Sequence, residues 1–529
     1  MSGADVVTEQ VGQAGEQGAR LQSARVAQLI EYAVTSPRAE HITTTSPLTG
    51  DPLADLPLST PDDVALAFTG ARAVFRSWSR IPAATRAQVF YRFHDLILEH
   101  QVEMLDIIQL ETGKTRTDAF SEVVDAAVTA RYYARRAPGM LRPRHRAGLV
   151  PVLTDVIETR RPVGVVGVVA PWNYPLSMGI SEVLPALLAG NAVVVRPDPS
   201  TSLTMLFVAE LLARAGLPQR ALQVVLGDGP TVGGAVLAAA DYVCFTGSTR
   251  TGRQVAVDAA SRLVGASLEL GGKNPMYVAV DADLDRAVPG AIAACFVNAG
   301  QVCISIERLY LHHDIADEFL TRFVRAVEKL KVGVDLAYGA DVGSLSGHGQ
   351  LERVTAHVED ARAKGADILI GGRALPEIGP FAYAPTVVDG ITDDMLLARE
   401  ETFGPVVGVY RVGNDAEFVL AANDSEFGLS ASIWSRDLQR ARGIAQLVES
   451  GTVNINDGFA VGYIAKDAPM GGMKSSGMGR RHGEAGLLRF TEAQTIAAAR
   501  GVSLTTPTTQ EAARYMTGML RAMAVFGRR

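Results

Sequence analysis

Between residues 164 and 270, short runs rich in β-branched residues alternate with segments of helical length. The runs lie at 164–169, 192–196, 222–226, 242–245 and 263–270, and the helical segments at 176–189, 202–215, 231–240 and 249–261. Strands that alternate with helices form βαβ units, which build a parallel sheet covered by helices on both faces. Right-handed crossovers then predict an α/β, doubly wound domain whose ligand binds at the carboxyl ends of the strands.

The alternation continues on both sides of this region. A second α/β series begins near residue 275, where NPMYVAV reads as a strand, and two amphipathic helices are predicted at 317–333 and 351–365. Upstream, the segment from Thr60 opens with a capping residue, Pro and two acids, and helical spacing continues through about residue 135. We therefore expect a helical N-terminal block and two tightly packed α/β domains.

Composition narrows the function classes. The chain has 529 residues, of which 47% are hydrophobic, so it can bury the cores of two or three domains. Its net charge of -7 argues against a nucleic-acid binder, which would carry a basic stripe. Residues 1–24 are polar and lack the apolar core of a signal peptide, so we expect a disordered extension. No apolar stretch reaches the roughly 20 residues of a membrane span, and we expect a cytoplasmic protein.

The three cysteines, at 244, 295 and 303, cannot form a disulfide framework. The sequence has neither a C-x-x-C pair nor an H-E-x-x-H motif, so we expect chemistry without a metal in a reducing compartment. An isolated free cysteine is usually an inert core residue. Cys244 and Cys295 lie in apolar segments and fit that interpretation, whereas Cys303 follows Gly300 and Gln301 in the string NAGQVC.

Loops with unusual residues follow the predicted strands. They are Pro171-Trp172-Asn173-Tyr174-Pro175, Pro197-Asp198-Pro199, Gly227-Asp228-Gly229 and Thr246-Gly247-Ser248, and the last strand ends at Glu269 before two glycines. Glycines at such positions let the backbone approach a phosphate at a helix N-terminus. Each loop alone is weak evidence for a phosphate site. Gly227, Gly229 and Gly233, for example, only approach the G-x-G-x-x-G pattern.

Taken together, the motifs carry a family resemblance. PWNYP, FTGSTRTG, LELGGKNP, NAGQVC, EETFGPVV and PMGGMKSSGMGRRHG occur in this order, and over about 45–500 the chain resembles the aldehyde dehydrogenase superfamily. The resemblance implies that Cys303 attacks an aldehyde carbon and that the Asn173 amide and the Cys303 backbone N–H hold the oxyanion. It also implies that Glu269 activates the water that hydrolyses the resulting thioester.

The resemblance also implies an architecture. Residues 25–146 and 164–272 would form a Rossmann-like NAD(P)-binding domain, and 273–482 the catalytic domain. Segments 147–163 and 483–500 would supply strands of a small β oligomerisation flap, giving a homodimer or homotetramer. The tail, 501–529, has an amphipathic pattern, and we expect it to pack on its own or a neighbouring subunit rather than on a membrane surface.

The expected cofactor is NADP, with NAD also usable. The common family string K-P-x-E reads Arg196-Pro197-Asp198-Pro199 here, so the ribose-binding Glu is replaced by Pro199. A carboxylate there would repel a 2′-phosphate by roughly 4 kcal/mol at 4 Å and an effective dielectric of 20, and Arg196 can pair with phosphate. The residues that the resemblance assigns to the cofactor are Trp172, Arg196, Asp198, Pro199, Gly227, Gly229, Thr246, Gly247, Ser248, Gly252, Glu401 and Phe403.

The substrate stays open at this point. Within the family the chain looks most like the NADP-type succinate-semialdehyde dehydrogenases, which makes succinate semialdehyde the first expectation. However, better-studied members hold the substrate carboxylate with two arginines, and this sequence has Ser181 and Val297 at those two positions. The expected funnel residues, Tyr174, Met178, Phe459 and Met470, suit an aromatic or medium-chain aliphatic aldehyde equally well. Two further alternatives are a CoA-acylating relative, against which Glu269 argues, and a non-catalytic relative.

Overall fold

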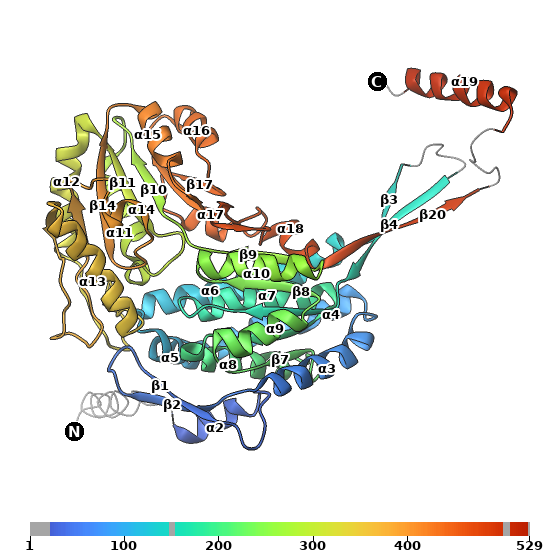
Figure 1. Cartoon of the computed structure of the whole chain (residues 1–529), viewed down its shortest axis with the longest axis horizontal. Coiled ribbons are helices and arrows are strands. Elements are labelled where there is room, and N and C mark those ends of the chain that lie inside the picture. Colours follow the sequence, from blue (N-terminus) through green and yellow to red (C-terminus); the bar gives the residue numbers. More distant parts are fainter. Residues whose placement is uncertain (1–21, 148–153, 501–507, 527–529) are drawn as a thin grey trace, which may run out of the picture. The chain divides into compact units, whose positions relative to one another are not determined.

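The computed structural model describes residues 22–147, 154–500 and 508–526 (Figure 1). The chain divides into two compact units. The larger unit runs to Met140 and resumes over Pro162–Thr491, and the smaller unit contains Leu141–Arg161 and the chain from Glu492 onward. Most of the expected disordered extension lies outside the described residues. Helix α2, Ser23–Ile30, already begins at residue 23, so the last two residues of the extension expected over 1–24 are helical.

The first sheet of the larger unit has six strands in the order β19-β9-β8-β5-β6-β7. Five of them are parallel and confirm the predicted strands: β5 (Val165–Val169), β6 (Ala192–Arg196), β7 (Leu222–Val224), β8 (Tyr242–Thr246) and β9 (Gly265–Glu269). Strand β19, Gly477–Met478, adds an antiparallel edge. The connecting segments include α7 (Pro175–Ala189), η1 (Pro199–Thr201), α8 (Ser202–Arg214), η2 (Gly229–Gly233), α9 (Gly234–Ala239) and α10 (Thr249–Ser261). The doubly wound α/β prediction is therefore confirmed.

The second sheet has seven strands in the order β12-β13-β14-β11-β10-β16-β17. Their bounds are β10 Asn274–Val278, β11 Ile306–His312, β12 Asp367–Ile370, β13 Thr386–Asp389, β14 Val406–Val412, β16 Ser430–Trp434 and β17 Thr452–Ile455. The helices of this region are α11 (Leu284–Phe296), α12 (His313–Val327), α13 (His348–Ala363), α14 (Leu396–Arg399), α15 (Asp415–Asn423), α16 (Leu438–Leu447), α17 (Ala460–Ile464) and α18 (Gly483–Leu488). The short segments η3 (Val297–Gly300), β15 (Phe427–Gly428) and β18 (Met473–Lys474) complete it.

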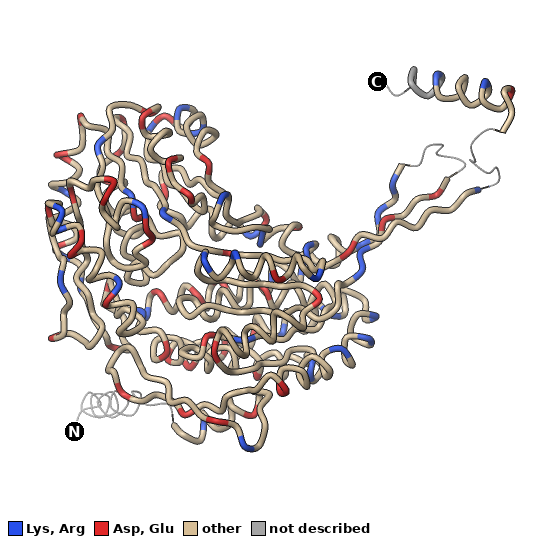
Figure 2. The backbone as a smooth tube through the Cα atoms, viewed as in Figure 1, with Lys and Arg blue, Asp and Glu red and all other residues tan. Residues whose placement is uncertain are grey.

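The N-terminal block combines a β-hairpin with long helices. The hairpin pairs β1 (His41–Thr45) with β2 (Pro52–Pro57), and the helices are α3 (Pro61–Trp78), α4 (Ala83–Glu99), α5 (Gln101–Thr112) and α6 (Arg116–Met140). The predicted start at Thr60 is confirmed, because Thr60 and Asp63 cap α3 reciprocally. Helix α6 packs against α4 and α7, which brings its first turns next to the loop that precedes α7. Figure 2 shows basic and acidic residues interspersed along the described chain.

The smaller unit holds a three-stranded sheet, β20-β4-β3, with β3 at Arg144–Arg146, β4 at Thr154–Pro162 and β20 at Thr491–Ala499. The strand expected over 483–500 begins only at Thr491, because residues 483–488 form helix α18 of the larger unit. In the tail, α19 spans Gln510–Phe526 and Tyr515 is 77% exposed. Within the described ranges, we find no helix that combines the length and apolarity needed to cross a membrane.

Candidate active site

A strained turn presents Cys303 between η3 and β11. Asn298, Ala299 and Gly300 all have left-handed backbone angles, with φ of 51°, 52° and 70°. A Cβ on Gly300 would lie 2.0 Å from the Gly404 carbonyl oxygen, so only glycine fits there. Consecutive left-handed residues are costly and cluster at functional sites. Backbone conformation therefore explains the NAGQ residues of the motif, because they form the turn that presents Cys303.

Hydrogen bonds from several elements hold this turn. The backbone N–H of Asn298 donates to the Asp118 carboxylate of α6 at 3.1 Å. The Gln301 amide donates to the carbonyl oxygens of Asn298 and Ser344, each at 3.2 Å. The Asn274 amide donates to the Cys303 carbonyl oxygen at 2.8 Å. These bonds fix the backbone on both sides of the thiol.

The loop with Asn173 leads from β5 into α7 and is tied to the same turn. Its Nδ2 donates to the Gln301 carbonyl oxygen at 3.0 Å, and its own carbonyl oxygen accepts from the Asn298 amide at 3.2 Å. A side-chain amide has two N–H groups, so one remains for a ligand oxygen. The structure thus places the Asn173 amide beside the cysteine turn, as an oxyanion donor requires.

A buried ion pair that the sequence argument missed supports the Asn173 loop. Lys114 Nζ lies 2.5 Å from Glu122 Oε1, and both side chains are fully buried. The same ammonium donates to the Asn173 carbonyl oxygen at 2.8 Å. The other Glu122 oxygen accepts the backbone N–H groups of Leu176 and Ser177, at 3.0 Å each, at the start of α7. Neither residue lies in a quoted motif, so only the folded chain reveals the pair.

Replacing Lys114 with Met should lower the free energy of unfolding by about 3–5 kcal/mol, because Glu122 would become an unpaired buried charge. Denaturant or thermal unfolding of the purified variant measures this. Arg322→Met is the matched control, because Arg322 pairs at the surface with Glu318 and Asp285. That change should cost less than about 1 kcal/mol. Equal losses in the two variants would show that the Lys114 pair does not support the loop.

Glu269 ends β9 and is buried. Its Oε1 lies 3.4 Å from Arg481 Nε, and both side chains are less than a tenth exposed. Burial raises the pKa of Glu269, the Arg481 charge opposes that rise, and the Glu182 carboxylate adds to it. Arg481 lies in the string PMGGMKSSGMGRRHG, but no role was predicted for it. The sequence therefore identified the carboxylate and missed its cation.

Cys303 is the one partly exposed cysteine of the three, whereas Cys244 and Cys295 are buried, which confirms their packing role. Burial raises the pKa of the Cys303 thiol to about 12. The Glu269 and Glu401 carboxylates contribute to that rise, and the Arg481 guanidinium opposes it. Arg481 therefore favours the thiolate against the effects of burial and of the two carboxylates.

An apolar cavity of about 420 Å³ opens on one side of Cys303. The four expected funnel residues, Tyr174, Met178, Phe459 and Met470, all line it, together with Phe120, Val124, Val128, Val297, Val302, Ile304, Tyr463 and Ile464. Ser181 is buried elsewhere, with its hydroxyl donating to the Ser177 carbonyl oxygen at 2.6 Å. The residue types indicate a site for the body of an organic substrate.

Two cations also border this cavity, and both are already paired. Lys466 lies 2.5 Å from Asp125, which also accepts the Tyr463 hydroxyl at 3.0 Å. Arg481 pairs with Glu269 and, through Nη2, with Glu182 at 3.1 Å. Asp125 and Lys466 lie outside every quoted motif, so no sequence signal pointed to them. Their pairing leaves neither cation uncompensated at the cavity wall.

A second cavity, of about 190 Å³, opens on the other side of Cys303. It shares Asn173, Met178, Glu269 and Cys303 with the first cavity, so the thiol lies where the two meet. Six expected cofactor residues line it, namely Trp172, Thr246, Gly247, Ser248, Glu401 and Phe403. The other six, Arg196, Asp198, Pro199, Gly227, Gly229 and Gly252, lie outside its lining, and their role stays a prediction.

The residue types around this second cavity fit a dinucleotide. Ser248 caps α10, whose N-terminus offers backbone N–H groups to a phosphate. A Cβ on Gly271 would lie 2.7 Å from the Glu401 carboxylate, so the glycine keeps this wall open. Glu401 accepts the Gly272 N–H at 2.9 Å, and burial raises the pKa of Glu401 to about 7. A carboxylate at this depth is placed to accept ribose hydroxyls.

Phe403 closes the same wall in a left-handed conformation, with φ of 58°. The Glu307 carboxylate holds it by accepting its backbone N–H at 2.9 Å, and Lys273 pairs with Glu307 at 2.5 Å. The Phe403 ring meets Trp172 edge to face, with centroids 5.5 Å apart. The two aromatic residues that were assigned to the cofactor therefore contact each other across the cavity.

The loop after β6 differs from the expectation that Arg196 is available to pair with a phosphate. Arg196 is buried, and its Nε donates to the Gly227 carbonyl oxygen at 2.8 Å, while Nη1 lies 3.9 Å from Asp198. The Asp198 carboxylate accepts the backbone N–H and hydroxyl of Ser200, at 3.1 and 2.8 Å. Both side chains thus already have protein partners beside Pro199.

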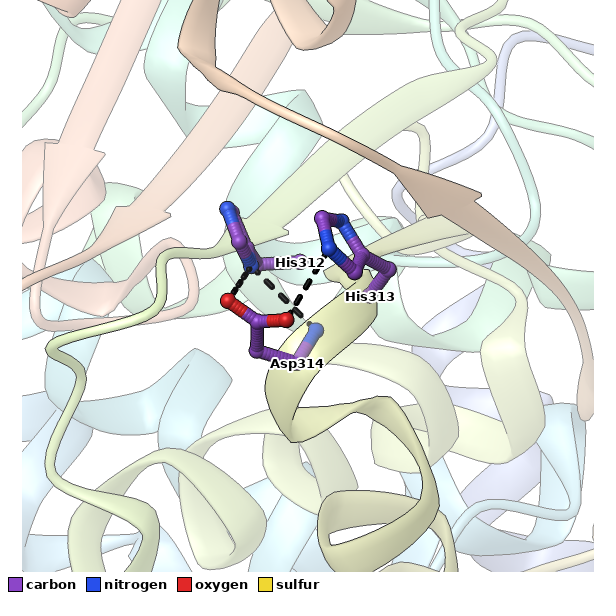
Figure 3. Close-up of side chains that lie close together, drawn as sticks. All are labelled: His312, His313 and Asp314. Carbon is purple, nitrogen blue, oxygen red and sulfur yellow. Dashed lines mark hydrogen bonds and ion pairs between the residues drawn. The ribbon is translucent and has the colours of Figure 1, made fainter.

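Among the described residues, three neighbouring side chains bring potential metal-binding atoms together, namely His312, His313 and Asp314 (Figure 3). Their atoms already have other partners. His312 Nδ1 accepts the Asp314 backbone N–H at 3.3 Å as the cap of α12, and His313 Nε2 lies 2.9 Å from the Asp314 carboxylate. We interpret the group as a helix cap with a surface ion pair.

Comparisons with known proteins agree with this geometry. Residues 34–496 match the model of the aldehyde dehydrogenase family. A Mycolicibacterium smegmatis protein that is provisionally named an NADP(+) succinate-semialdehyde dehydrogenase is 47% identical over 90% of this chain and 92% of its own length. The crystal structure of succinate-semialdehyde dehydrogenase from Burkholderia pseudomallei has a TM-score of 0.85 and 34% identity, covering 89% of this chain and 97% of that one. A Staphylococcus aureus betaine aldehyde dehydrogenase in complex with NAD+ has a TM-score of 0.84 and 30% identity, covering 90% and 98% of the two chains.

Proposed function

The chain belongs to the aldehyde dehydrogenase family, and on that premise we propose that it oxidises an aldehyde to a carboxylic acid with NADP⁺ or NAD⁺ at Cys303. One observation carries the proposal. Asn173, Glu269 and Cys303 all lie where an apolar cavity meets a cavity whose lining fits a dinucleotide. A nucleophile, an oxyanion donor and a base at one such junction are the groups that this oxidation requires.

The first step belongs to the thiol. The Cys303 thiolate attacks the aldehyde carbon from the junction, and the carbonyl oxygen becomes an oxyanion in a thiohemiacetal. The free N–H of the Asn173 amide and the Cys303 backbone N–H are the proposed donors to that oxyanion. One such donor is worth about 3–4 kcal/mol in the transition state.

The second step belongs to the carboxylate. The oxidised nicotinamide supplies the hydride acceptor, which leaves a thioester on Cys303. Glu269 then takes a proton from water as the water oxygen attacks the thioester carbon, and Cys303 leaves as thiolate. Because burial raises the pKa of Glu269, its carboxylate is a stronger base than an exposed one.

Two substrate classes remain, and separate observations favour them. The names of the relatives favour succinate semialdehyde. The cavity lining favours an uncharged aldehyde with an aromatic or medium-chain body, because Val297 is apolar and the Lys466 and Arg481 charges are both paired. We propose succinate semialdehyde first, and the uncharged aldehydes as the second candidate.

For the cofactor we propose NADP⁺ as the better partner, with NAD⁺ also used. The name of the 47% identical relative supports this, as does the Pro199 ring where the family has a carboxylate. The Asp198 carboxylate, one residue earlier, is occupied by Ser200. The Arg196 guanidinium, whose Nη1 lies 3.9 Å from Asp198, offsets part of the repulsion that this carboxylate would exert on a 2′-phosphate.

We also propose that the two sheets of the larger unit serve as cofactor and catalytic domains in a cytoplasmic homodimer or homotetramer. Strand β20 supports the assembly, because it is an edge strand that is exposed along almost its whole length, and free edges pair with other strands. A chain that sediments as a monomer at all concentrations would exclude the assembly.

A purified-enzyme panel tests the proposal. We expect reduced cofactor to appear with succinate semialdehyde, and kcat/KM to be at least about tenfold higher with NADP⁺ than with NAD⁺, a difference of 1.4 kcal/mol. Pentanal is the matched substrate, because it is of similar length and lacks the carboxylate, and benzaldehyde tests an aromatic body. Higher kcat/KM for pentanal or benzaldehyde would select the second candidate. If no aldehyde reduces either cofactor, the proposed function is wrong.

A further inference from the structure

A chain of alternating charges lies behind Glu269. Arg481 faces Glu269 at 3.4 Å and Glu182 at 3.1 Å, and Glu182 also pairs with Arg489. All four side chains are less than a tenth exposed, and Arg481 is among the largest fully buried side chains. Two carboxylates and two guanidinium groups balance in charge. The family reaction as proposed above uses only the first member of this chain.

Arg481 lies between the two cavities. It lines the apolar one, and its Nη2 lies 3.4 Å from the hydroxyl of Thr246, which lines the cofactor side. Its backbone is fixed, because it exchanges two hydrogen bonds with Met470, at 2.8 and 2.7 Å. Its other terminal nitrogen, Nη1, lies 2.8 Å from the sulfur of Met178, which lines both cavities. The guanidinium is therefore held in one place beside the reacting groups.

The contact with Glu269 is an ion pair without a hydrogen bond. Glu269 Oε1 and Arg481 Nε are both buried, and neither has a hydrogen-bond partner within the described part of the chain. At 3.4 Å the two charges still attract strongly in a buried site. An attraction without a directional bond keeps the carboxylate charged and leaves it free to turn toward a water or toward Cys303.

We propose that Arg481 is a positioning residue that keeps the Glu269 carboxylate charged and favours the Cys303 thiolate, so that base and nucleophile share one buried cation. This inference rests on the proposed function. Arg481 is the leading charge that opposes the effect of burial on the pKa of both groups. The other charges that face Glu269 are Glu182, Arg489 and Arg480, and those that face Cys303 are Glu269 and Glu401.

The expected effect follows from the sign of the charge. An opposite charge within about 4–6 Å lowers the pKa of a carboxyl group by about 1–3 units. Without Arg481, the pKa of Glu269 and the pKa of Cys303 should therefore both rise. The rate of thioester hydrolysis depends on ionised Glu269, and the rate of thiol alkylation depends on the thiolate, so both pH profiles should move to higher pH.

The test is Arg481→Met, which keeps an unbranched chain and removes the charge. We expect the midpoint of the kcat profile to move up by about 1–2 pH units, and we expect the same shift in the pH at which iodoacetamide reaches a fixed rate at Cys303, which we call the alkylation midpoint. Arg262→Met is the matched control, because its guanidinium is bound to the carbonyl oxygens of Ala240 and Leu237 and acts on neither group. The control should leave both midpoints within about 0.3 units of the original protein. Unmoved midpoints in a folded Arg481→Met variant would overturn the inference.

Arg481→Lys provides a second variant if the Met variant does not fold. An ammonium keeps the charge but cannot span Glu269 and Glu182 together. We expect midpoints within about 0.5 units of the original protein and a kcat that falls at least about fivefold. Unchanged kcat in Arg481→Lys would overturn the positioning role.

Two other results have distinct meanings. If Arg481 instead binds the substrate carboxylate, Arg481→Met raises the KM for succinate semialdehyde, leaves the KM for pentanal unchanged and does not move the alkylation midpoint. That outcome would also overturn the inference. Iodoacetamide needs no aldehyde and no cofactor, so the alkylation profile decides the role of Arg481 even if the proposed function fails.

Discussion

Replacing Cys303 with Ala should lower kcat by at least about 10⁴-fold, because the covalent intermediate loses its only nucleophile. The turn that presents the residue should survive, since the Gln301 amide and the Asn298 backbone N–H hold it through hydrogen bonds that do not involve the thiol. The loss should therefore appear in turnover with every aldehyde and both cofactors, measured by the absorbance of the reduced cofactor. The direction of the effect does not depend on which substrate class is correct.

The control for this variant is Cys295→Ala. Cys295 is a buried thiol in α11 that lines neither cavity, so its removal should leave kcat within about twofold. The Cys303→Ala protein should still bind the oxidised cofactor, which quenching of Trp172 fluorescence in the second cavity reports. A Cys303→Ala variant that retains cofactor binding and a tenth of the original turnover would remove Cys303 from the nucleophile's role.

Replacing Glu269 with Gln should separate the two halves of the reaction. Gln keeps the shape of the side chain but cannot accept a proton, so steady-state turnover should fall by about 10²–10⁴-fold. The first turnover should survive, because thioester formation does not require the water-activating base. Rapid mixing with aldehyde and oxidised cofactor should show a burst of about one reduced cofactor per site, followed by a slow phase.

The same variant has a pH signature. In the original protein the hydrolysis limb should fall as pH drops through the pKa of Glu269, which burial holds above its usual value. In Glu269→Gln that limb should disappear from the slow phase. A slow phase that keeps the original pH midpoint would mean that another group activates the water.

The sequence predicted the parallel strands of the six-stranded sheet to within about two residues. Strands β5 and β6 are valine-rich runs buried on both faces, and this pattern has few other structural solutions. The ends of helices that lack such a pattern were predicted less accurately. Helix α12 ends at Val327 although its periodicity continues to Leu330, because hydrogen bonds of the turn type follow it. Residues 483–488 are helical because their apolar side packs on α6 and α7, which composition alone does not reveal.

The candidate site likewise contains residues that the sequence predicted and residues that it did not. Asn173, Glu269 and Cys303 lie in motifs, and the structure brings all three to one junction. The Lys114–Glu122 and Asp125–Lys466 pairs and the Arg481 contacts join residues that are far apart in sequence, or whose neighbours give no periodic signal. A buried charged residue is identified in a structure by the opposite charge that compensates it. A single sequence does not show which residue supplies that opposite charge.

The most direct test of the central claim is to locate the covalent intermediate by mass spectrometry. Glu269→Gln should be mixed with succinate semialdehyde and oxidised cofactor, quenched in acid and digested. We expect one succinyl thioester per chain on the peptide with Cys303, and none on the peptides with Cys244 or Cys295, which are buried. Reduced cofactor that forms without any acyl group on Cys303 would contradict the account.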